Sequence, residues 1–159
     1  MNKKLRQATI CLLRKGDEVL LAMKKRGFGV GKWNGVGGKV KGEETVEQAA
    51  IRETQEEIGV TLVDMKQVGL LDFHFPEIPA EKDWDQQVVV FICNKWDGEP
   101  VELEEMLPKW FKLSDIPYDQ MWSDDILWMP KVFSGQKVKA EFIFSGEGKL
   151  KKYKFNELV

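Results

Sequence analysis

Cysteine and histidine are scarce in this chain, and their scarcity argues against several kinds of site. The 159 residues include two cysteines, Cys11 and Cys93, and one histidine, His74. Both cysteines stand in apolar, strand-like runs without metal-ligand spacing, so we expect two buried free thiols, as suits a reducing compartment. A single histidine argues against a histidine-based catalytic triad or a zinc centre. The alternating run around His74 favours a strand residue.

Long apolar runs and an excess of charge of one sign are also missing. The formal net charge is −2, so no general attraction to nucleic acid or to a membrane is expected. The apolar run after the basic start is too short for a secretion signal, and no run approaches the length of a transmembrane helix. We therefore expect a cytoplasmic protein that binds neither nucleic acid nor membrane, with the monomer as the default state.

The length and composition are those of an ordinary soluble domain. Apolar residues make up 43% and charged residues 31% of the 159 residues. No repeat, low-complexity segment or linker divides the chain. We expect residues 1–159 to form a single domain.

The most informative stretch runs from Gly38 to Val60 and follows the pattern G-x5-E-x7-R-E-U-x-E-E-x-G-U, where U is a bulky apolar residue. At about 7% usage per residue type, a chance match in one window is on the order of 10⁻⁸. One position departs mildly, because Thr54 stands at the first U. The fixed positions are Gly38, Glu44, Arg52, Glu53, Glu56, Glu57 and Gly59.

The same stretch contains the start and stop signals of a helix. Thr45 with Gln48 three residues later is a capping-box pair, and Gly59 is a typical C-terminal stop. These signals predict a helix over residues 46–58. The 3.6-residue period of this helix places Glu53, Glu56 and Glu57 on one side, beside an apolar stripe.

Three clustered carboxylates repel each other, which costs a few tenths of a kcal/mol per pair. A hard divalent cation gains from the same arrangement, because Mg²⁺ and Mn²⁺ prefer oxygen ligands. The alternative is a solvated acidic helix with glutamate–arginine pairs. Arg52 is open to two interpretations: it pairs with Glu44 and holds the loop before the helix, or it pairs with Glu56 one turn away.

The remaining chain reads as strands with one further helix. Strands are expected at 8–13, 19–23, 61–75 (irregular near Gly69), 87–93, 109–113, 138–144 and 150–155. Ser123 is a candidate N-cap for a helix from Asp124 to about Phe133, in which Pro130 introduces a kink or an early end. This order fits an α/β/α sandwich with a mixed sheet.

The pattern from Gly38 to Val60 is the Nudix box, and the chain resembles the Nudix hydrolases. The resemblance implies the Nudix-type α/β/α sandwich. Three further stretches resemble one branch of the family, which hydrolyses oxidised purine nucleoside triphosphates such as 8-oxo-dGTP and 2-hydroxy-dATP: 23–40 (MKKRGFGVGKWNGVGGKV), 104–122 (EEMLPKWFKLSDIPYDQMW) and 122–130 (WSDDILWMP). Together the matches cover most of the chain, from Thr9 to its end.

The resemblance also implies roles for individual residues. Mg²⁺, or Mn²⁺ in its place, would be held by Glu53, Glu56, Glu57, the backbone carbonyl of Gly37 and, from outside the box, Glu105. The residues expected to act in hydrolysis are Glu53, Glu56, Glu57, Arg52 and Glu44. The residues expected to bind the nucleotide are Thr9, Lys24, Phe28, Asn34, Gly37, Gly38, Lys39, Trp122, Asp124 and Asp125.

Each pocket residue outside the box has an ordinary structural interpretation as well. Asn34 before Gly35 is a favoured turn pair, and Trp122 is suited either to stacking on a purine or to core packing. Asp124 and Asp125 are favourable in the first turn of a helix, but two carboxylates in an apolar pocket cannot both stay charged. Glu105 is equally consistent with a solvated loop.

One region departs from the resemblance. Between Phe75 and Val88 the chain is about four residues longer than the family pattern leads us to expect. As a result Gln86 or Gln87 falls where the family places an apolar pocket residue, and Trp84 is a candidate to fill that place. The preferred base is therefore the least determined part of the inference.

These observations predict a Mg²⁺-dependent nucleoside triphosphate pyrophosphohydrolase. It would convert a modified purine dNTP to the monophosphate and pyrophosphate, with a box glutamate as general base, and so keep damaged nucleotides out of DNA. The alternatives are a Nudix enzyme for another diphosphate, such as ADP-ribose, and a non-catalytic nucleotide-binding module.

Overall fold

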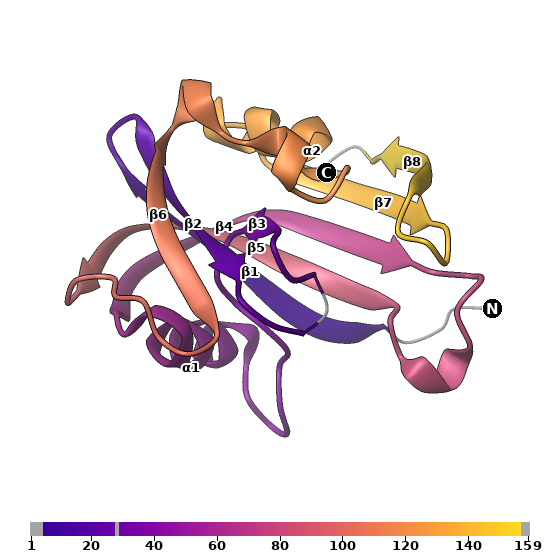
Figure 1. Cartoon of the computed structure of the whole chain (residues 1–159), viewed down its shortest axis with the longest axis horizontal. Helices are drawn as coiled ribbons and strands as arrows, with labels where there is room; N and C mark the ends of the chain where they lie inside the picture. The colour runs from indigo at the N-terminus through magenta and orange to yellow at the C-terminus, as the bar shows by residue number, and fades with distance from the viewer. Residues whose placement is uncertain (1–4, 28, 157–159) are drawn as a thin grey trace.

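A mixed sheet of eight strands with a helix on each face forms the body of the protein (Figure 1). The computed structural model describes residues 5–27 and 29–156. The strands are β1 (Arg6–Lys15), β2 (Glu18–Lys24), β3 (Trp33–Asn34), β4 (Thr61–His74), β5 (Gln86–Asp97), β6 (Met106–Lys112), β7 (Val138–Phe144) and β8 (Leu150–Phe155). The helices are α1 (Val46–Ile58) and α2 (Asp125–Phe133), with 3-10 turns at η1 (Ala80–Lys82), η2 (Leu113–Asp115) and η3 (Tyr118–Gln120). The predicted fold class is confirmed.

The strand order is β3-β2-β1-β5-β4-β7-β8, and β6 pairs with β2. The β1–β5 and β4–β7 pairs are parallel, and the other neighbours are antiparallel. The two parallel pairs bring together strands that are far apart in the sequence. They place β1, β4 and β5 at the centre of the sheet.

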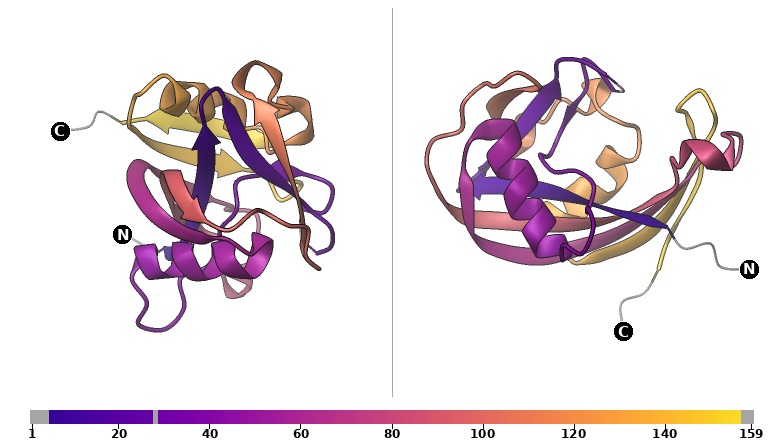
Figure 2. Two further views of the ribbon diagram at one scale, coloured as in Figure 1. Left: turned by 90° about the vertical axis from the view of Figure 1, so that its left-hand side faces the viewer. Right: turned by 90° about the horizontal axis from the view of Figure 1, so that it is seen from below.

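The centre of the sheet is apolar on both faces because a helix covers each of them (Figure 2). On one face, Ala50 and Ile58 of α1 pack in a cluster with residues of β1, β2 and β5. On the other face, Trp128 and Val132 of α2 pack with residues of β4, β5 and β7. This burial on two sides explains why β5 reads as a nearly continuous run of valines and other apolar residues.

Helix α1 begins and ends as the sequence predicts. The Thr45 hydroxyl accepts a hydrogen bond from the Gln48 backbone N–H at 3.1 Å, and the Gln48 side chain accepts one from the Thr45 N–H at 2.9 Å. At the other end Gly59 is left-handed, with φ of 76°, which a residue without a Cβ adopts at little cost. These local caps fix the orientation of the box side chains on the helix.

The predicted start of α2 is wrong by one residue. Asp124, not Ser123, is the N-cap, and no side chain caps this helix. The preceding turn makes a cap unnecessary, because the Trp122 carbonyl accepts from the Asp125 N–H at 3.0 Å. Pro130 lies inside the helix, which ends three residues later at Phe133. The acidic side chains at the helix start are therefore not used for capping.

All seven predicted strands are present, but β5 extends four residues past its predicted end and β6 begins three residues before its predicted start. The short strand β3 is not among the predicted ones. β7 and β8 have the predicted bounds, and the register of β4 shifts between Gln67 and Gly69. His74 lies in β4, and Cys11 and Cys93 are buried free thiols. In the described part of the chain, no helix has the length and hydrophobicity to cross a membrane.

Candidate active site

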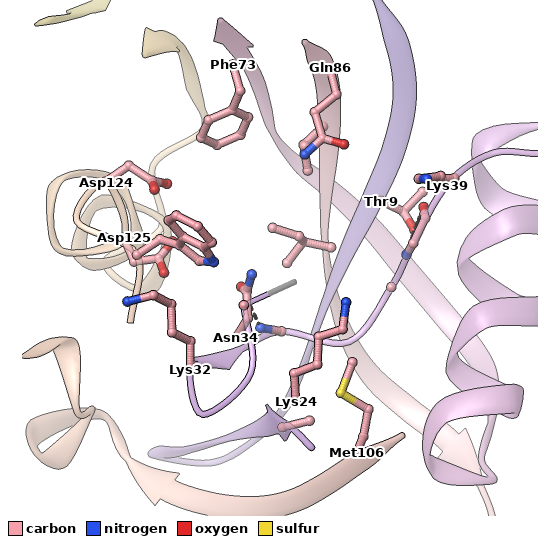
Figure 3. A pocket seen from close by; sticks show the side chains of 18 of the residues that line it. Thr9, Lys24, Lys32, Asn34, Lys39, Phe73, Gln86, Met106, Asp124 and Asp125 are labelled. Carbon is pink, nitrogen blue, oxygen red and sulfur yellow. Dashed lines mark hydrogen bonds between the residues drawn. The ribbon is translucent and has the colours of Figure 1, made fainter. Parts of the chain in front are cut away.

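A cavity of about 290 Å³ opens between the sheet, α2 and the glycine-rich segments after β2 and β3 (Figure 3). Its size approaches the lower end of small-molecule sites. Every described residue predicted to bind nucleotide lines it; these are Thr9, Lys24, Asn34, Gly37, Gly38, Lys39, Trp122, Asp124 and Asp125. The remaining one, Phe28, lies outside the described residues.

The cavity has further lining residues that the sequence analysis did not identify. They come mostly from the sheet and supply most of the apolar surface: Ile10, Ala22, Gly29, Lys32, Gly35, Phe73, Phe75, Val88, Met106 and Phe144. Strand alternation could have placed Phe73 and Phe75 on one face. The pairing of β4 with β5, which brings Phe73 beside Gln86, had no signal in the sequence.

Two glycines let the chain pass closely between β1 and α1 at one end of the cavity. A Cβ on Gly37, where φ is 144°, would lie 2.1 Å from the Thr9 carbonyl oxygen, and a Cβ on Gly38 would lie 2.5 Å from the Glu53 carboxyl carbon. The Thr9 hydroxyl lies 3.3 Å from both the N–H and the carbonyl oxygen of Gly38. Glycine is therefore required here for close approach.

Glu57 reaches this loop from α1. Its carboxylate accepts a hydrogen bond from the Gly37 N–H at 2.7 Å, and the residue is only 7% exposed. Burial raises the pKa of Glu57 to about 8; the Gly37 N–H opposes this shift, and the negative charge of Glu53 adds to it. A nearby cation would lower this pKa and stabilise the carboxylate.

Arg52 makes both of the pairings that the sequence left open. Its Nε and Nη2 donate to Glu44 at 2.7 and 2.9 Å, and its Nη1 donates to Glu53 at 2.9 Å and to Glu56 at 3.3 Å. Nη2 also donates to the Lys39 carbonyl at 3.0 Å. Hydrogen bonds from Arg52 lower the pKa of Glu44 to about 2. Arg52 thus ties the loop before α1 to the box carboxylates.

The potential metal ligands at this end of the cavity suit a hard divalent cation, which Nudix hydrolases generally use. Glu53, Glu56 and Glu57 project from one side of α1, and Glu57 and Glu53 approach the backbone at Gly37 and Gly38 respectively. All of these potential ligands are oxygen atoms, which Mg²⁺ and Mn²⁺ prefer. The mutual repulsion of partly buried carboxylates gives such an ion a favourable electrostatic environment.

Glu105, the ligand predicted from outside the box, pairs with Arg26 in this structure. Its side chain is 49% exposed and accepts a hydrogen bond from Arg26 Nε at 2.9 Å. The hydrogen bond from Arg26 lowers the pKa of the carboxyl. The backbone of Glu105 is held as well, since its carbonyl accepts from the Lys25 N–H at 2.9 Å.

The other end of the cavity contains two buried carboxyl groups. Asp124 is 3% and Asp125 is 2% exposed. Asp124 accepts a hydrogen bond from the Trp128 indole N–H at 2.8 Å, whereas Asp125 Oδ2 has no hydrogen-bond partner among the described residues. Burial raises the pKa of Asp124 to about 6, and burial together with the Asp124 charge raises the pKa of Asp125 well above its ordinary value. The environment of the pair therefore disfavours the state in which both carboxyl groups are charged.

Asn34 and Trp122 complete this end of the cavity. Asn34 lies in β3, and its side-chain oxygen accepts from the Gly35 N–H at 2.8 Å. The ring of Trp122 meets Phe144 edge to face at 6.2 Å, and Lys32 Nζ lies 5.2 Å from its centroid. Both residues line the cavity, so neither is only a turn or a core residue.

The structure shows which side chain stands where the family resemblance predicts an apolar pocket residue, after the longer loop between Phe75 and Val88. Gln86 lines the cavity, whereas Gln87 points to the other face and donates to Asp72 at 3.1 Å. Trp84 packs edge to face on Phe75 at 5.5 Å and lines a separate, neighbouring hollow. The polar side chain of Gln86, and not Trp84, therefore occupies this position in the cavity wall.

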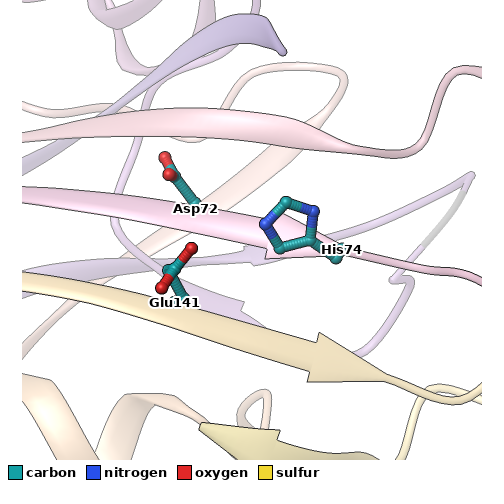
Figure 4. A group of neighbouring side chains, drawn as sticks. All are labelled: Asp72, His74 and Glu141. Atoms are coloured by element: carbon teal, nitrogen blue, oxygen red, sulfur yellow. The ribbon is translucent and has the colours of Figure 1, made fainter. Parts of the chain in front are cut away.

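A second group of potential ligands lies on the face of the sheet opposite the cavity (Figure 4). In the described ranges, Asp72, His74 and Glu141 are the one trio of acidic, histidine or cysteine side chains whose ligand atoms all lie within 4.8 Å of one another. Asp72 is opposite Glu141 in the β4–β7 ladder, and Glu141 is opposite Lys154 in β8. Their positions are those of cross-strand polar neighbours on a half-exposed sheet face.

Comparisons with known proteins agree with this geometry. The family model described as the NUDIX domain matches residues 3–132. Oxidized purine nucleoside triphosphate hydrolases of Danio rerio and Mus musculus are 43% and 39% identical, each over 94% of both chains. The crystal structure of a MutT protein from Bacillus halodurans superposes with a TM-score of 0.83 at 22% identity, covering 96% of this chain and 98% of that one. The chain belongs to the Nudix hydrolase family.

Proposed function

We propose that this protein hydrolyses oxidised or otherwise modified purine nucleoside triphosphates, such as 8-oxo-dGTP and 2-hydroxy-dATP, to the monophosphate and pyrophosphate. One observation carries the proposal: a single cavity extends from the loop that contacts the Nudix-box glutamates to the buried pair Asp124 and Asp125. The names of the zebrafish and mouse relatives support the same substrates. The reaction would remove damaged nucleotides from the precursor pool of DNA.

The base would bind at the end formed by Asn34, Trp122, Asp124 and Asp125. In this proposal the aspartate pair would share one proton, so that one carboxyl would donate to the purine edge while the other would accept from it. The Asn34 oxygen is engaged by Gly35, and its NH₂ group remains to donate to the base. Stacking on Trp122 would add about 1–3 kcal/mol. A proton that moves between the two aspartates would accommodate different oxidised purines.

The triphosphate would extend toward the glycine loop, where Lys24 and Lys39 supply positive charge. Glu53, Glu56, Glu57 and the Gly37 carbonyl would hold Mg²⁺, or Mn²⁺ in its place, with Glu105 as a further ligand. The bound ion supplies charge neutralisation of the phosphates and activates water. A box glutamate, with Glu56 or Glu57 favoured over Glu53, takes the proton as the water oxygen bonds to phosphorus and the phosphoanhydride bond breaks. Arg52 keeps these carboxylates in position.

The test is pyrophosphate release from 8-oxo-dGTP, 2-hydroxy-dATP, dGTP and ADP-ribose with Mg²⁺ and with EDTA. We expect high kcat/KM for a modified purine, no activity in EDTA, and a loss of at least about 100-fold in Glu57→Gln. Glu47→Gln, at an exposed and variable position of the box on the same helix, is the matched control. Activity mainly on ADP-ribose would replace the substrate assignment, and no turnover at all would indicate a binding module.

The proposal treats residues 1–159 as one domain that acts as a cytoplasmic monomer on a small nucleotide. The two apolar clusters share one sheet, which supports a single folding unit. Light scattering coupled to size exclusion should give a mass near 18.3 kDa. A dimer mass would contradict the monomer assignment and leave the chemistry unchanged.

A further inference from the structure

Gln86 opens β5 with its side chain on the cavity face of the sheet. Along β5, Val88 and Val90 belong to the apolar cluster on the α2 side, whereas Val89 and Phe91 belong to the cluster on the α1 side. Because side chains alternate along a strand, Gln86 shares its face with Val88, and both line the cavity. The ladder with β4 places Gln86 opposite Phe73. Gln86 thus brings a polar group to a mainly apolar part of the sheet surface.

The side-chain amide of Gln86 has no hydrogen-bond partner among residues 5–27 and 29–156, although the residue is half-buried. Gln87, its neighbour, has both ends of its amide engaged: it donates to Asp72 at 3.1 Å and accepts from Gln7 at 3.3 Å. An amide can donate twice and accept twice. Leaving it without partners beside apolar surface is unfavourable unless water or a ligand bonds to it.

The other polar groups of the base end lie on different walls. Figure 3 shows Gln86 on the strand side with its amide directed into the cavity, Asp124 and Asp125 on the α2 side, and Asn34 across the cavity from Gln86. The Asn34 oxygen accepts from Gly35, and Asp124 accepts from Trp128. Gln86 therefore adds an uncommitted donor and acceptor on a wall where the neighbouring residues are Phe73 and Val88.

We propose that Gln86 is a specificity-determining residue that hydrogen-bonds to an oxygen or amino substituent of the purine base. The inference rests on the proposed function and deepens it, because it names the wall that discriminates among purines. A purine with a polar substituent on the edge that meets β5 satisfies the amide. A purine with C–H at that position leaves the amide without its partner, so the enzyme discriminates against it.

The test compares Gln86→Met with Gln87→Met. Methionine has nearly the length of glutamine but lacks its hydrogen-bonding amide, and Gln87 provides the same exchange on the opposite face of the same strand. The substrates form two pairs that each differ by an added oxygen on the base, 8-oxo-dGTP with dGTP and 2-hydroxy-dATP with dATP. The quantity measured is the ratio of kcat/KM within each pair.

We expect Gln86→Met to lower the ratio for at least one pair by about 3- to 10-fold, the size of one hydrogen bond in a half-buried site. Gln87→Met should leave both ratios within about twofold of the wild-type values. Ratios within twofold of wild type in Gln86→Met would overturn the proposal. A ribose contact is tested separately with 8-oxo-GTP against 8-oxo-dGTP, and a change confined to that ratio would also overturn it.

A binding measurement makes the result independent of turnover. Calorimetry with the 8-oxo-dGMP and dGMP products should show the same loss of discrimination in Gln86→Met. If that variant does not fold, the side-chain NH₂ resonance of Gln86 in the wild-type protein must shift on adding the product, and an unchanged resonance would refute the contact. Failure of the wild type to hydrolyse any purine triphosphate would instead refute the proposed function, so the two failures are distinguishable.

Discussion

Replacing Asp125 with asparagine should make the free energy of unfolding less dependent on pH. Burial raises the folded-state pKa of Asp124 to about 6 and that of Asp125 well above the ordinary 3.8. At pH values between 3.8 and the folded-state pKa values, the unfolded chain has released protons that the folded protein retains. Stability from this pair is therefore fully present below pH 3.8 and is lost as the pH rises through the folded-state values.

The Asp124 value gives the scale of one such titration. A difference between about 6 and 3.8, at about 1.36 kcal/mol per pKa unit, corresponds to about 3 kcal/mol. Asp124 is retained in Asp125→Asn, but the neighbouring amide is neutral at every pH, which removes the titration of Asp125. Because burial raises the pKa of Asp125 as well, we expect the variant to lose less stability than the wild type between pH 4 and pH 8, by more than about 0.5 kcal/mol.

Urea denaturation across this pH range, with EDTA present to exclude metal binding, measures the difference. Other titrating groups are common to both proteins and cancel in the comparison. Asp119→Asn, at an exposed position on η3, is the control. Its free energy of unfolding should depend on pH in the same way as that of the wild type. If the Asp125→Asn curve also runs parallel, within about 0.5 kcal/mol, the two carboxyls do not share a proton in the folded protein and the mechanism of base recognition is wrong.

Three further predictions concern the Nudix box. Thr45→Ala removes one half of the capping box and should cost about 1 kcal/mol, seen as a decrease of about 2–4 °C in Tm; an unchanged Tm would contradict the role of the cap. Arg52→Lys loses the two-pronged contact with Glu44 and should lower kcat about 10- to 100-fold with a smaller change in KM, measured by steady-state kinetics. Gly37→Ala places a Cβ against the Thr9 carbonyl and should cost more than about 3 kcal/mol in denaturation experiments, whereas a stable variant would show that the loop can move away.

Much of the fold could be predicted because its signals are local. The ends of α1 depend on Thr45, Gln48 and Gly59, and each acts through neighbours in the chain. The strands β7 and β8 end at a turn that the residues between them specify. The box carboxylates are equally local, since helical periodicity alone places Glu53, Glu56 and Glu57 on one side.

The errors and open alternatives arose where partners come from elsewhere in the chain. Ser123 looked like an N-cap, but the turn that leads into α2 satisfies the first N–H groups with its own carbonyls. Arg52 makes both pairings because its guanidinium has enough donors for the loop and for the helix. Gln86 and Gln87 could not be told apart, because a shift of one residue exchanges the two faces of a strand.

The amino-acid sequence by itself determined the box, its helix and the acidic end of the site, since these residues lie within one continuous segment. Tertiary structure alone decided what the base end contains. Parallel pairing of β1 with β5 and antiparallel pairing of β4 with β5 bring Thr9, Phe73 and Gln86 to one cavity. Packing of α2 on the same face buries Asp124 and Asp125, and this burial, which no local pattern reports, is what raises the pKa of both carboxyl groups.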